Sequence, residues 1–502
     1  MRKCGMLLPV FSLPSPYGIG AFSKEAYAFV DALKLAGQSY WQILPLGPTG
    51  YGDSPYQSFS AFAGNPYFID LETLTNEGLL TRTECEGADF GEERRYIAYD
   101  KLYQNRFLLL KLAFDRWMDK LGKTKAKKVL DGSLMPETKE YCLYMAVKNA
   151  FDGQSWILWD EDIRLCRPEA VNRYSQELEE EILFYQFQQY KFQEQWKKLK
   201  DYANAQGIKM IGDIPIYVAF DSADAWAHPE LFQFDEDNLP VAVAGCPPDA
   251  FSETGQLWGN PLYRWNYHKK TDFAWWMKRM EYSFSLYDVV RVDHFRGFDE
   301  YYSIPYGRKD AVQGTWKKGP GLSIFKTMKK HFGTEELPVI AEDLGILTPT
   351  VLKLVEDTGF PGMKVLEFAF DGGVESDYLP HNHCKNCVVY TGTHDNDTLM
   401  GWLEKMPLAD RLRALEYMNG RNGDGPWVNW DFIRMALASV ADLTIIPVQD
   451  YLGLGTEARI NEPSTLGKNW KWRLENGELK EEICRKARRL ARLYGRHGEE
   501  ED

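Results

Sequence analysis

The chain has 502 residues, of which 44% are hydrophobic and 26% charged, a composition typical of a globular protein rather than a disordered one. Its net charge of −14 would repel a polyanion, so nucleic acid is not expected as a partner. No apolar run reaches the roughly 18 residues of a membrane span, and prolines interrupt the apolar stretch near the N-terminus, so neither a membrane partner nor a secretory signal is predicted. The eight cysteines are scattered, which favours free thiols in a reducing cytoplasm and a cytoplasmic location.

Short β-rich runs alternate with helical segments along most of the chain. Several of these runs are continuously apolar, as expected for parallel strands that are buried on both faces. We predict strands over Tyr40–Leu46, Tyr67–Asp70, Lys209–Val218, Tyr287–His294, Pro338–Glu342, Met363–Phe370, Cys387–Thr393 and Leu443–Gln449. Eight such strands separated by helices predict a (β/α)8 TIM barrel of the α/β class with inserted, mostly helical subdomains.

Helical patterns fill the segments between these strands. A helix is predicted over Glu25–Ala36, and Tyr185, Phe192 and Trp196 belong to an apolar face with helical spacing, interpreted as core. Residues 93–200 have a helical pattern and no clear strand. We interpret them as a helical insertion between barrel strands 2 and 3, within a single catalytic unit spanning residues 1–502.

A short segment rich in histidine and cysteine could bind a metal ion. His381, His383, Cys384 and Cys387 fall close together, and imidazoles and thiols are zinc ligands. Structural zinc sites usually combine two separated ligand pairs, however, and Cys387 begins an apolar run. We therefore interpret the cluster as a surface loop leading into a strand and expect no metal.

Three acidic residues lie where barrel strands end. Asp293 and Glu342 each close a predicted strand, and Asp395 follows shortly after another. In a barrel, the carboxyl ends of all strands meet on one face, where active sites form. A single acid at such a position could simply cap a helix, but three together indicate a site. Arg291, two residues before Asp293 on the same strand face, could hold that carboxylate ionised.

Aromatic residues indicate which chemistry the acids serve. Clustered carboxylates could bind Mg²⁺ or Ca²⁺, or they could transfer glycosyl groups, which in a retaining enzyme needs two carboxyl groups about 5–5.5 Å apart. Aromatics make up 14% of the chain, and sugar rings pack their apolar faces on aromatic planes. Several aromatics follow predicted strands, namely Tyr51, Tyr56, Trp258, Tyr263 and Trp265. We therefore favour a sugar substrate.

Long segments of the sequence resemble a known family. They are residues 12–20, residues 41–57, residues 212–218 and residues 245–252, together with the surroundings of the three acids. The chain resembles the 4-α-glucanotransferases of the amylomaltase and disproportionating-enzyme family, relatives of the α-amylases. The resemblance implies transfer of α-1,4-glucan segments from a maltooligosaccharide, starch- or glycogen-type donor to glucose or another glucan, without a cofactor.

The resemblance also implies residue roles. Asp293 resembles the nucleophile, Glu342 the acid and base, and Asp395 the carboxylate that binds donor-sugar hydroxyls. The remaining matched residues resemble substrate-binding positions: the donor-sugar contacts Arg291, His294 and His394, the shaping residue Asp213, the loop positions Tyr56, Asp249 and Trp258, and the sugar contact Asn461. After Pro463 the family usually has glycine, whereas this chain has Ser464.

Three other interpretations remain open at this point. An α-amylase-like hydrolase would use the same three acids, but the long matches at residues 53–64 and 245–258 favour a transferase. A catalytically silent glucan-binding protein would tolerate the loss of an acid, and none is lost. A metal-dependent barrel enzyme would respond to a chelator.

Overall fold

A computed structural model describes residues 2–248, 252–345, 347–418 and 428–497, and its centre is an eight-stranded parallel sheet. The strands follow the order β10-β11-β12-β1-β2-β3-β6-β9, so that each barrel strand pairs with the next one along the chain except β9 and β10, which form the two ends of the sheet. Their bounds are β1 (Lys3–Leu7), β2 (Tyr40–Gln42), β3 (Lys209–Pro215), β6 (Val289–Asp293), β9 (Val339–Ala341), β10 (Gly362–Val365), β11 (Cys387–Tyr390) and β12 (Leu443–Pro447). The amide of Ala341 donates to Pro361 at 3.0 Å and brings the two ends of the sheet together. The predicted (β/α)8 barrel is confirmed.

One of the eight predicted strands is wrong. Residues of Tyr67–Asp70 form the 3-10 helix η3 (Pro66–Phe68), because Pro66 lacks an amide proton and Asn65 caps the turn by accepting from the Tyr67 amide at 3.0 Å. The missing barrel strand is β1, which pairs with both β2 and β12. Its sequence, Lys-Cys-Gly-Met-Leu, lacks the β-branched residues on which the prediction of strands relied.

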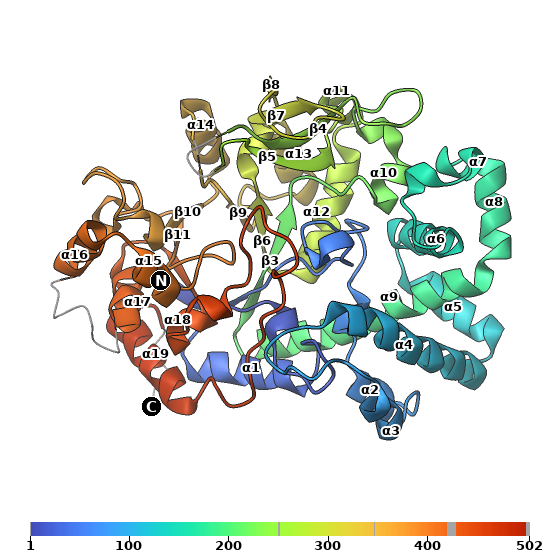
Figure 1. Ribbon diagram of the computed structural model, residues 1–502, viewed down its shortest axis with the longest axis horizontal. Helices are drawn as coiled ribbons and strands as arrows, with labels where there is room; N and C mark the ends of the chain where they lie inside the picture. Colours follow the sequence, from blue (N-terminus) through green and yellow to red (C-terminus); the bar gives the residue numbers. More distant parts are fainter. Residues whose placement is uncertain (1, 249–251, 346, 419–427, 498–502) are drawn as a thin grey trace.

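Helices of the segment between β2 and β3 gather on one side of the barrel (Figure 1). They are α2 (Leu71–Asn76), α3 (Arg82–Gly87), α4 (Tyr99–Leu121), α5 (Lys123–Ser133), α6 (Pro136–Ala150), α7 (Glu161–Arg164), α8 (Pro168–Glu177) and α9 (Glu179–Ala205). As its spacing predicts, α9 buries Tyr185, Phe192 and Trp196. The division of the chain into a catalytic unit and an insertion at 93–200 stays a prediction.

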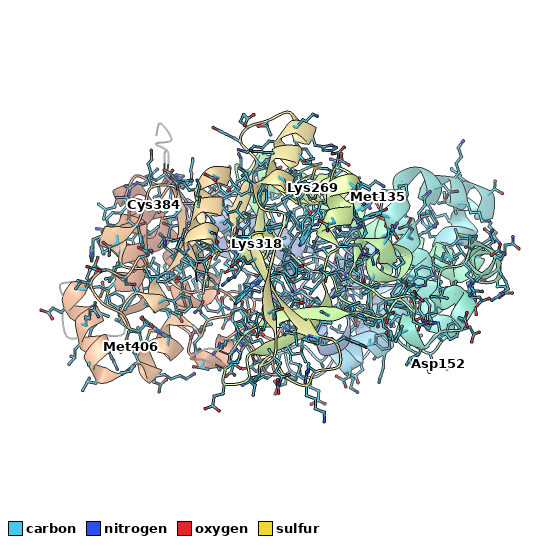
Figure 2. The ribbon with its side chains drawn as sticks, turned by 90° about the horizontal axis from the view of Figure 1, so that it is seen from above. Met135, Asp152, Lys269, Lys318, Cys384 and Met406 are labelled. Carbon is cyan, nitrogen blue, oxygen red and sulfur yellow. The ribbon has the colours of Figure 1, made fainter. Side chains whose placement is uncertain are left out.

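The other helices surround the rest of the barrel. The helix predicted at the start of the chain is α1 (Lys24–Leu35), which begins where the Ser23 side chain accepts from the Glu25 amide. The remaining helices are α10 (Ala223–Ala227), α11 (Trp265–Lys270), α12 (Ala274–Leu286), α13 (Leu322–Phe332), α14 (Pro349–Thr358), α15 (Leu399–Lys405), α16 (Leu408–Tyr417), α17 (Val428–Ala438), α18 (Val448–Leu452) and α19 (Glu481–Leu493). Seen from above, Met135 and Asp152 lie on one side of the molecule and Cys384 and Met406 on the other (Figure 2). No helix in the described ranges is long and apolar enough to cross a membrane.

A second, antiparallel sheet was not predicted from the sequence. Its strands are β4 (Ala242–Cys246), β5 (Gln256–Pro261), β7 (Glu300–Pro305) and β8 (Thr315–Lys318), in the order β5-β4-β7-β8. They belong to the long connections that follow β3 and β6. This sheet matters for the site because β5 carries Trp258.

Candidate active site

Asp293 and Glu342 start from neighbouring positions on paired strands. Asp293 is the last residue of β6, and Glu342 directly follows β9. Val292 is paired with Ala341, and the Glu342 amide donates to the Val292 carbonyl at 3.1 Å. Because paired strands lie about 4.8 Å apart, the two carboxyl groups leave the barrel side by side. The structure thus brings together two acids that lie 49 positions apart in the sequence.

Arg291 links the strand-end acids from inside the barrel. Its side chain is buried, and Nη1 donates to both carboxylate oxygens of Asp213, at 2.8 and 2.7 Å. Its Nη2 lies 3.0 Å from Oδ1 of Asp293. One guanidinium therefore fixes two carboxylates from two adjacent strands, and a buried charge is compensated on both sides.

The electrostatics of the acid pair follow from burial and charge. Burial raises the pKa of both Asp293 and Glu342, while the positive charge of Arg291 lowers both. The negative charge of Glu342 raises the pKa of Asp293 further. The backbone amides of His294 and Leu344 donate to Glu342 at 2.7 and 2.8 Å, which limits the rise of its pKa. Two adjacent carboxyl groups with raised pKa values share one proton over a wide pH range.

Asp395 is held by residues that follow β12. Asn461 Nδ2 donates to Oδ1 of Asp395 at 2.6 Å, and Arg459 Nη2 donates to the Asp395 backbone carbonyl at 2.7 Å. Arg459 also donates from Nε to the Asn461 carbonyl at 2.7 Å. Arg459 was not predicted as a site residue, although it stands two positions before Asn461. Its function as a clamp depends on a contact between two distant loops.

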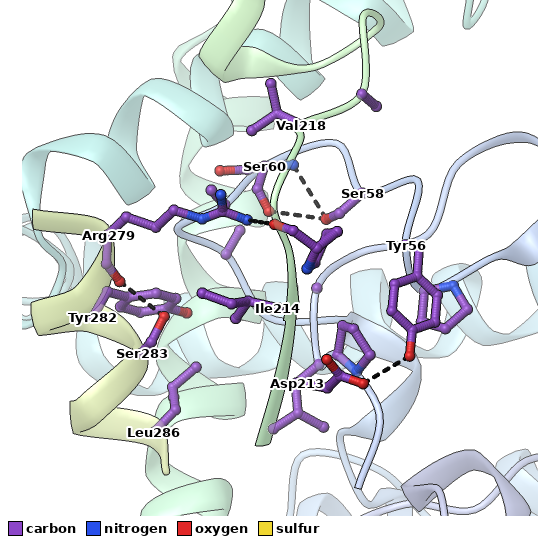
Figure 3. A pocket seen from close by; sticks show the side chains of 18 of the residues that line it. Tyr56, Ser58, Ser60, Asp213, Ile214, Val218, Arg279, Tyr282, Ser283 and Leu286 are labelled. Carbon is purple, nitrogen blue, oxygen red and sulfur yellow. Dashed lines mark hydrogen bonds between the residues drawn. The ribbon is translucent and has the colours of Figure 1, made fainter. Parts of the chain in front are cut away.

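Tyr56 connects the Asp213–Arg291 pair to His394. Its hydroxyl donates to Oδ2 of Asp213 at 2.8 Å (Figure 3). The same hydroxyl lies 2.8 Å from Nε2 of His394. Because the single Tyr56 hydroxyl proton is donated to Asp213, the hydroxyl can only accept from His394. Nε2 of His394 therefore carries a proton and donates it to the Tyr56 hydroxyl. The Tyr56 and His394 rings also stack, with centroids 5.3 Å apart. Burial lowers the pKa of His394, so this ring is neutral.

His294 has an unusual backbone at the end of β6. Its φ of 53° lies in the left-handed region, where a non-glycine residue is strained. This conformation aims its amide at Glu342 and lets its ring pack edge-on against Trp258, with centroids 4.7 Å apart. Burial, and secondarily the charge of Arg296, lowers the pKa of His294 to about 3. His294 is thus a neutral hydrogen-bonding group beside the acids.

A groove of about 840 Å³ opens above these residues. Its lining includes Asp293, Asp395 and Asn461 together with the aromatic residues Tyr56, Trp258 and Trp470. A second pocket beneath Tyr56 and Asp213, lined partly by Arg279 and Tyr282, has a volume of only about 50 Å³ (Figure 3). That space fits a few water molecules but no sugar ring. The groove is therefore the only one of these two pockets that can receive a glucan.

Of the candidate residues predicted from the sequence, six line this groove: Tyr56, Trp258, Asp293, His294, Asp395 and Asn461. Four others contact these lining residues without lining the groove themselves: Asp213, Arg291, Glu342 and His394. Asp249 lies outside the described residues. Trp470 and Tyr217, which line the groove, were missed, because only the fold brings their loops to it. In the described part of the chain, no group of three or more His, Cys, Asp or Glu residues is arranged to hold a metal ion. His383 instead contacts the Tyr378 carbonyl at 2.9 Å.

Asp293 lines an aromatic-lined groove, and Glu342 stands beside it on the paired strand end. This arrangement defines a barrel enzyme that processes glycosidic bonds. The comparisons with known proteins specify the family. A family profile described as 4-alpha-glucanotransferase matches residues 8–479, and the chain belongs to this family. The expected family is thus confirmed.

Individual relatives agree along the whole chain. The 4-alpha-glucanotransferase of Clostridium butyricum is 49% identical over 97% of this chain and 99% of its own length. That of Thermus thermophilus is 45% identical over 98% of each. Among solved structures, an amylomaltase from Streptococcus agalactiae in complex with acarbose matches with a TM-score of 0.95 and 39% identity, over 99% of this chain and 100% of the other.

Proposed function

We propose that this protein transfers α-1,4-glucan segments between sugars by a retaining double displacement. The observation that carries the proposal is the placement of Asp293 and Glu342 on paired strand ends, with Asp293 lining an aromatic-lined groove. Adjacent carboxyl groups match a retaining mechanism, whereas an inverting one needs room for a water molecule between them.

In the first step, Asp293 attacks the anomeric carbon and Glu342 protonates the leaving oxygen. The bond between the anomeric carbon and that oxygen breaks, and an ester to Asp293 forms. The ion pair with Arg291 at 3.0 Å stabilises the negative charge that Asp293 needs as the nucleophile, and the mechanism requires the shared proton to be on Glu342 when the donor is bound. Asp395, fixed by Asn461, would accept hydrogen bonds from donor-sugar hydroxyls and stabilise positive charge at the anomeric carbon.

In the second step, an acceptor hydroxyl gives its proton to Glu342 and attacks the same carbon from the opposite side. The ester to Asp293 breaks and its carboxylate is restored. Two inversions retain the α configuration. His294 and His394, both neutral, would hydrogen-bond sugar hydroxyls without adding charge to the site.

The choice between transfer and hydrolysis depends on what reaches the intermediate. Tyr217, Trp258 and Phe220 line the same groove as Asp293 and could hold an acceptor sugar by stacking. A bound acceptor displaces water and presents its hydroxyl at high effective concentration. This supports a transferase over an α-amylase-like hydrolase with the same acids.

The expected substrates are maltooligosaccharides and starch- or glycogen-type glucans as donors, with glucose or a glucan as acceptor. The carboxyl and imidazole groups suffice for both steps, so the proposal includes no cofactor. Eight free cysteines support a cytoplasmic location. We further propose that residues 1–502 act as one catalytic unit, with 93–200 as its helical insertion.

Incubation with maltotriose tests the proposal. Products are separated by chain length while free glucose and total reducing ends are assayed. We expect glucose and a ladder of longer maltooligosaccharides with constant reducing ends, and no products from an Asp293→Asn variant. A rise in reducing ends without longer products would establish a hydrolase instead.

A further inference from the structure

Two cysteines lie together at the amino end of β11, away from the groove. Cys384 is exposed and Cys387, the first residue of the strand, is 1% exposed. The chain bends between them, where the Cys387 amide donates to the Lys385 carbonyl at 3.0 Å. Cys384 lies on the side of the molecule opposite Met135 and Asp152 (Figure 2). The pair is therefore separate from the carboxyl ends of the barrel strands, where the acids lie.

The two thiols lie on the same short bend. Cys387 Sγ donates to the Cys384 carbonyl at 3.0 Å, and Cys384 Sγ donates to the Asn386 carbonyl at 3.5 Å. The bend is anchored on both sides, because the Asp442 amide donates to the Lys385 carbonyl at 2.8 Å and Asn386 Nδ2 donates to the Gly359 carbonyl at 3.1 Å. These contacts hold both thiols on one short bend, with Cys384 open to solvent and Cys387 buried.

We propose that Cys384 and Cys387 form a thiol–disulfide exchange site whose co-substrate is a low-molecular-weight disulfide. The Cys384 thiolate attacks one sulfur of that disulfide, forms a mixed disulfide and releases one thiol. The Cys387 thiolate then attacks Cys384 Sγ and releases the second thiol. One small disulfide is reduced to two thiols, and the protein pair is oxidised to one intramolecular disulfide.

The order of these steps follows from exposure. Of the eight cysteines, Cys384 alone is exposed, so it is the thiol that a small disulfide reaches first. Burial raises the pKa of Cys387, so its thiolate is scarce and the closing step is the slow one. Its rate therefore increases with pH. Since the pair lies before β11 and Asp395 lies after it, closure leaves the groove intact.

Mass spectrometry of the reduced, full-length protein treated with oxidised glutathione tests the site. We expect wild type to lose two hydrogens, with the disulfide mapped to the peptide containing Cys384 and Cys387. Cys387→Ser should stop at a mixed disulfide on Cys384, and Cys384→Ser should not react there. Cys166→Ser, which alters a half-buried cysteine elsewhere, should behave as wild type.

Two results would overturn the inference. One is a mixed disulfide on Cys384 that persists in wild type as long as in Cys387→Ser, because Cys387 then does not resolve it. The other is no reaction at Cys384 in wild type. Glucan transfer is not the readout, so the maltotriose result and this result can fail independently.

Discussion

Replacing Tyr56 with phenylalanine tests how the buried polar network prepares the site. The change removes one hydroxyl that donates to Asp213 at 2.8 Å and accepts from His394 at 2.8 Å. The ring remains and can still stack on His394. Any loss of activity therefore reports on the two hydrogen bonds rather than on the shape of the groove.

The expected magnitude follows from the partners that remain. Asp213 keeps both contacts with Arg291, and His394 keeps Asp395 at 3.4 Å. The loss is thus close to that of one hydrogen bond to a charged group, about 1.5–3 kcal/mol. If this free energy is lost from the stabilisation of the transition state, kcat/KM decreases by about 10- to 150-fold.

The assay is glucose release from maltotriose under initial-rate conditions. Tyr202→Phe is the matched control, because Tyr202 also donates to an aspartate, Asp31, at 2.6 Å but does not line the groove. We expect the control to keep wild-type kcat/KM. A Tyr56→Phe enzyme within twofold of wild type would refute the reasoning, since the network would then contribute nothing to transfer.

Three further changes probe the loops and the buried acids. Asn461→Ala removes the 2.6 Å bond to Asp395 and should lower kcat/KM by about 10- to 100-fold in the same assay. Ser464→Gly should raise the free energy of unfolding by about 1 kcal/mol, measured by denaturant titration, because Ser464 has a φ of 66°. Glu367→Gln should gain stability relative to wild type as pH rises from 5 to 8, by up to about 1.4 kcal/mol per pH unit. Burial raises the pKa of Glu367 well above its usual value in the folded protein. The unfolded chain therefore loses this proton at a lower pH than the folded protein does. Between the two pKa values, the stability of the wild type decreases as the pH rises.

Each of these changes has a control and a contradictory outcome. Asn461→Asp should have a lower kcat/KM than Asn461→Ala, because it places a second carboxylate beside Asp395. Equal kcat/KM values for the two variants would argue against the contact between Asn461 and Asp395. Ser464→Ala should not raise the free energy of unfolding. If Ser464→Ala raises it as much as Ser464→Gly does, relief of backbone strain is not the cause of the stabilisation. If wild type and Glu367→Gln change equally with pH, Glu367 is not protonated in the folded protein.

The barrel and its acids were predictable because they depend on local patterns. Asp293 and Glu342 end apolar strands, and parallel topology alone forces such ends together. Strand β1 was not predictable in the same way, since Lys3–Leu7 acts as a strand only through its partners on both sides. The opposite error occurs at Tyr67–Asp70, where a composition typical of strands predicts a strand but Pro66 starts a 3-10 helix.

The supports of the site depend on contacts between distant segments. Arg459 reaches Asp395 across loops that follow different strands, and no local pattern encodes that pairing. Trp258 was expected from its family position, but the antiparallel strand that carries it was not predicted. The left-handed backbone of His294 is likewise invisible in the sequence, because most such positions are occupied by glycine.

Mass spectrometry of a Glu342→Gln variant exposed to α-maltosyl fluoride tests the central claim most directly. Fluoride leaves without an acid, so Asp293 can still attack, while the missing base slows attack by an acceptor. We predict a maltosyl ester that accumulates on the peptide containing Asp293 and is absent from the Asp293→Asn, Glu342→Gln double variant. An adduct on another carboxylate, or a product of β configuration without any adduct, would contradict the account.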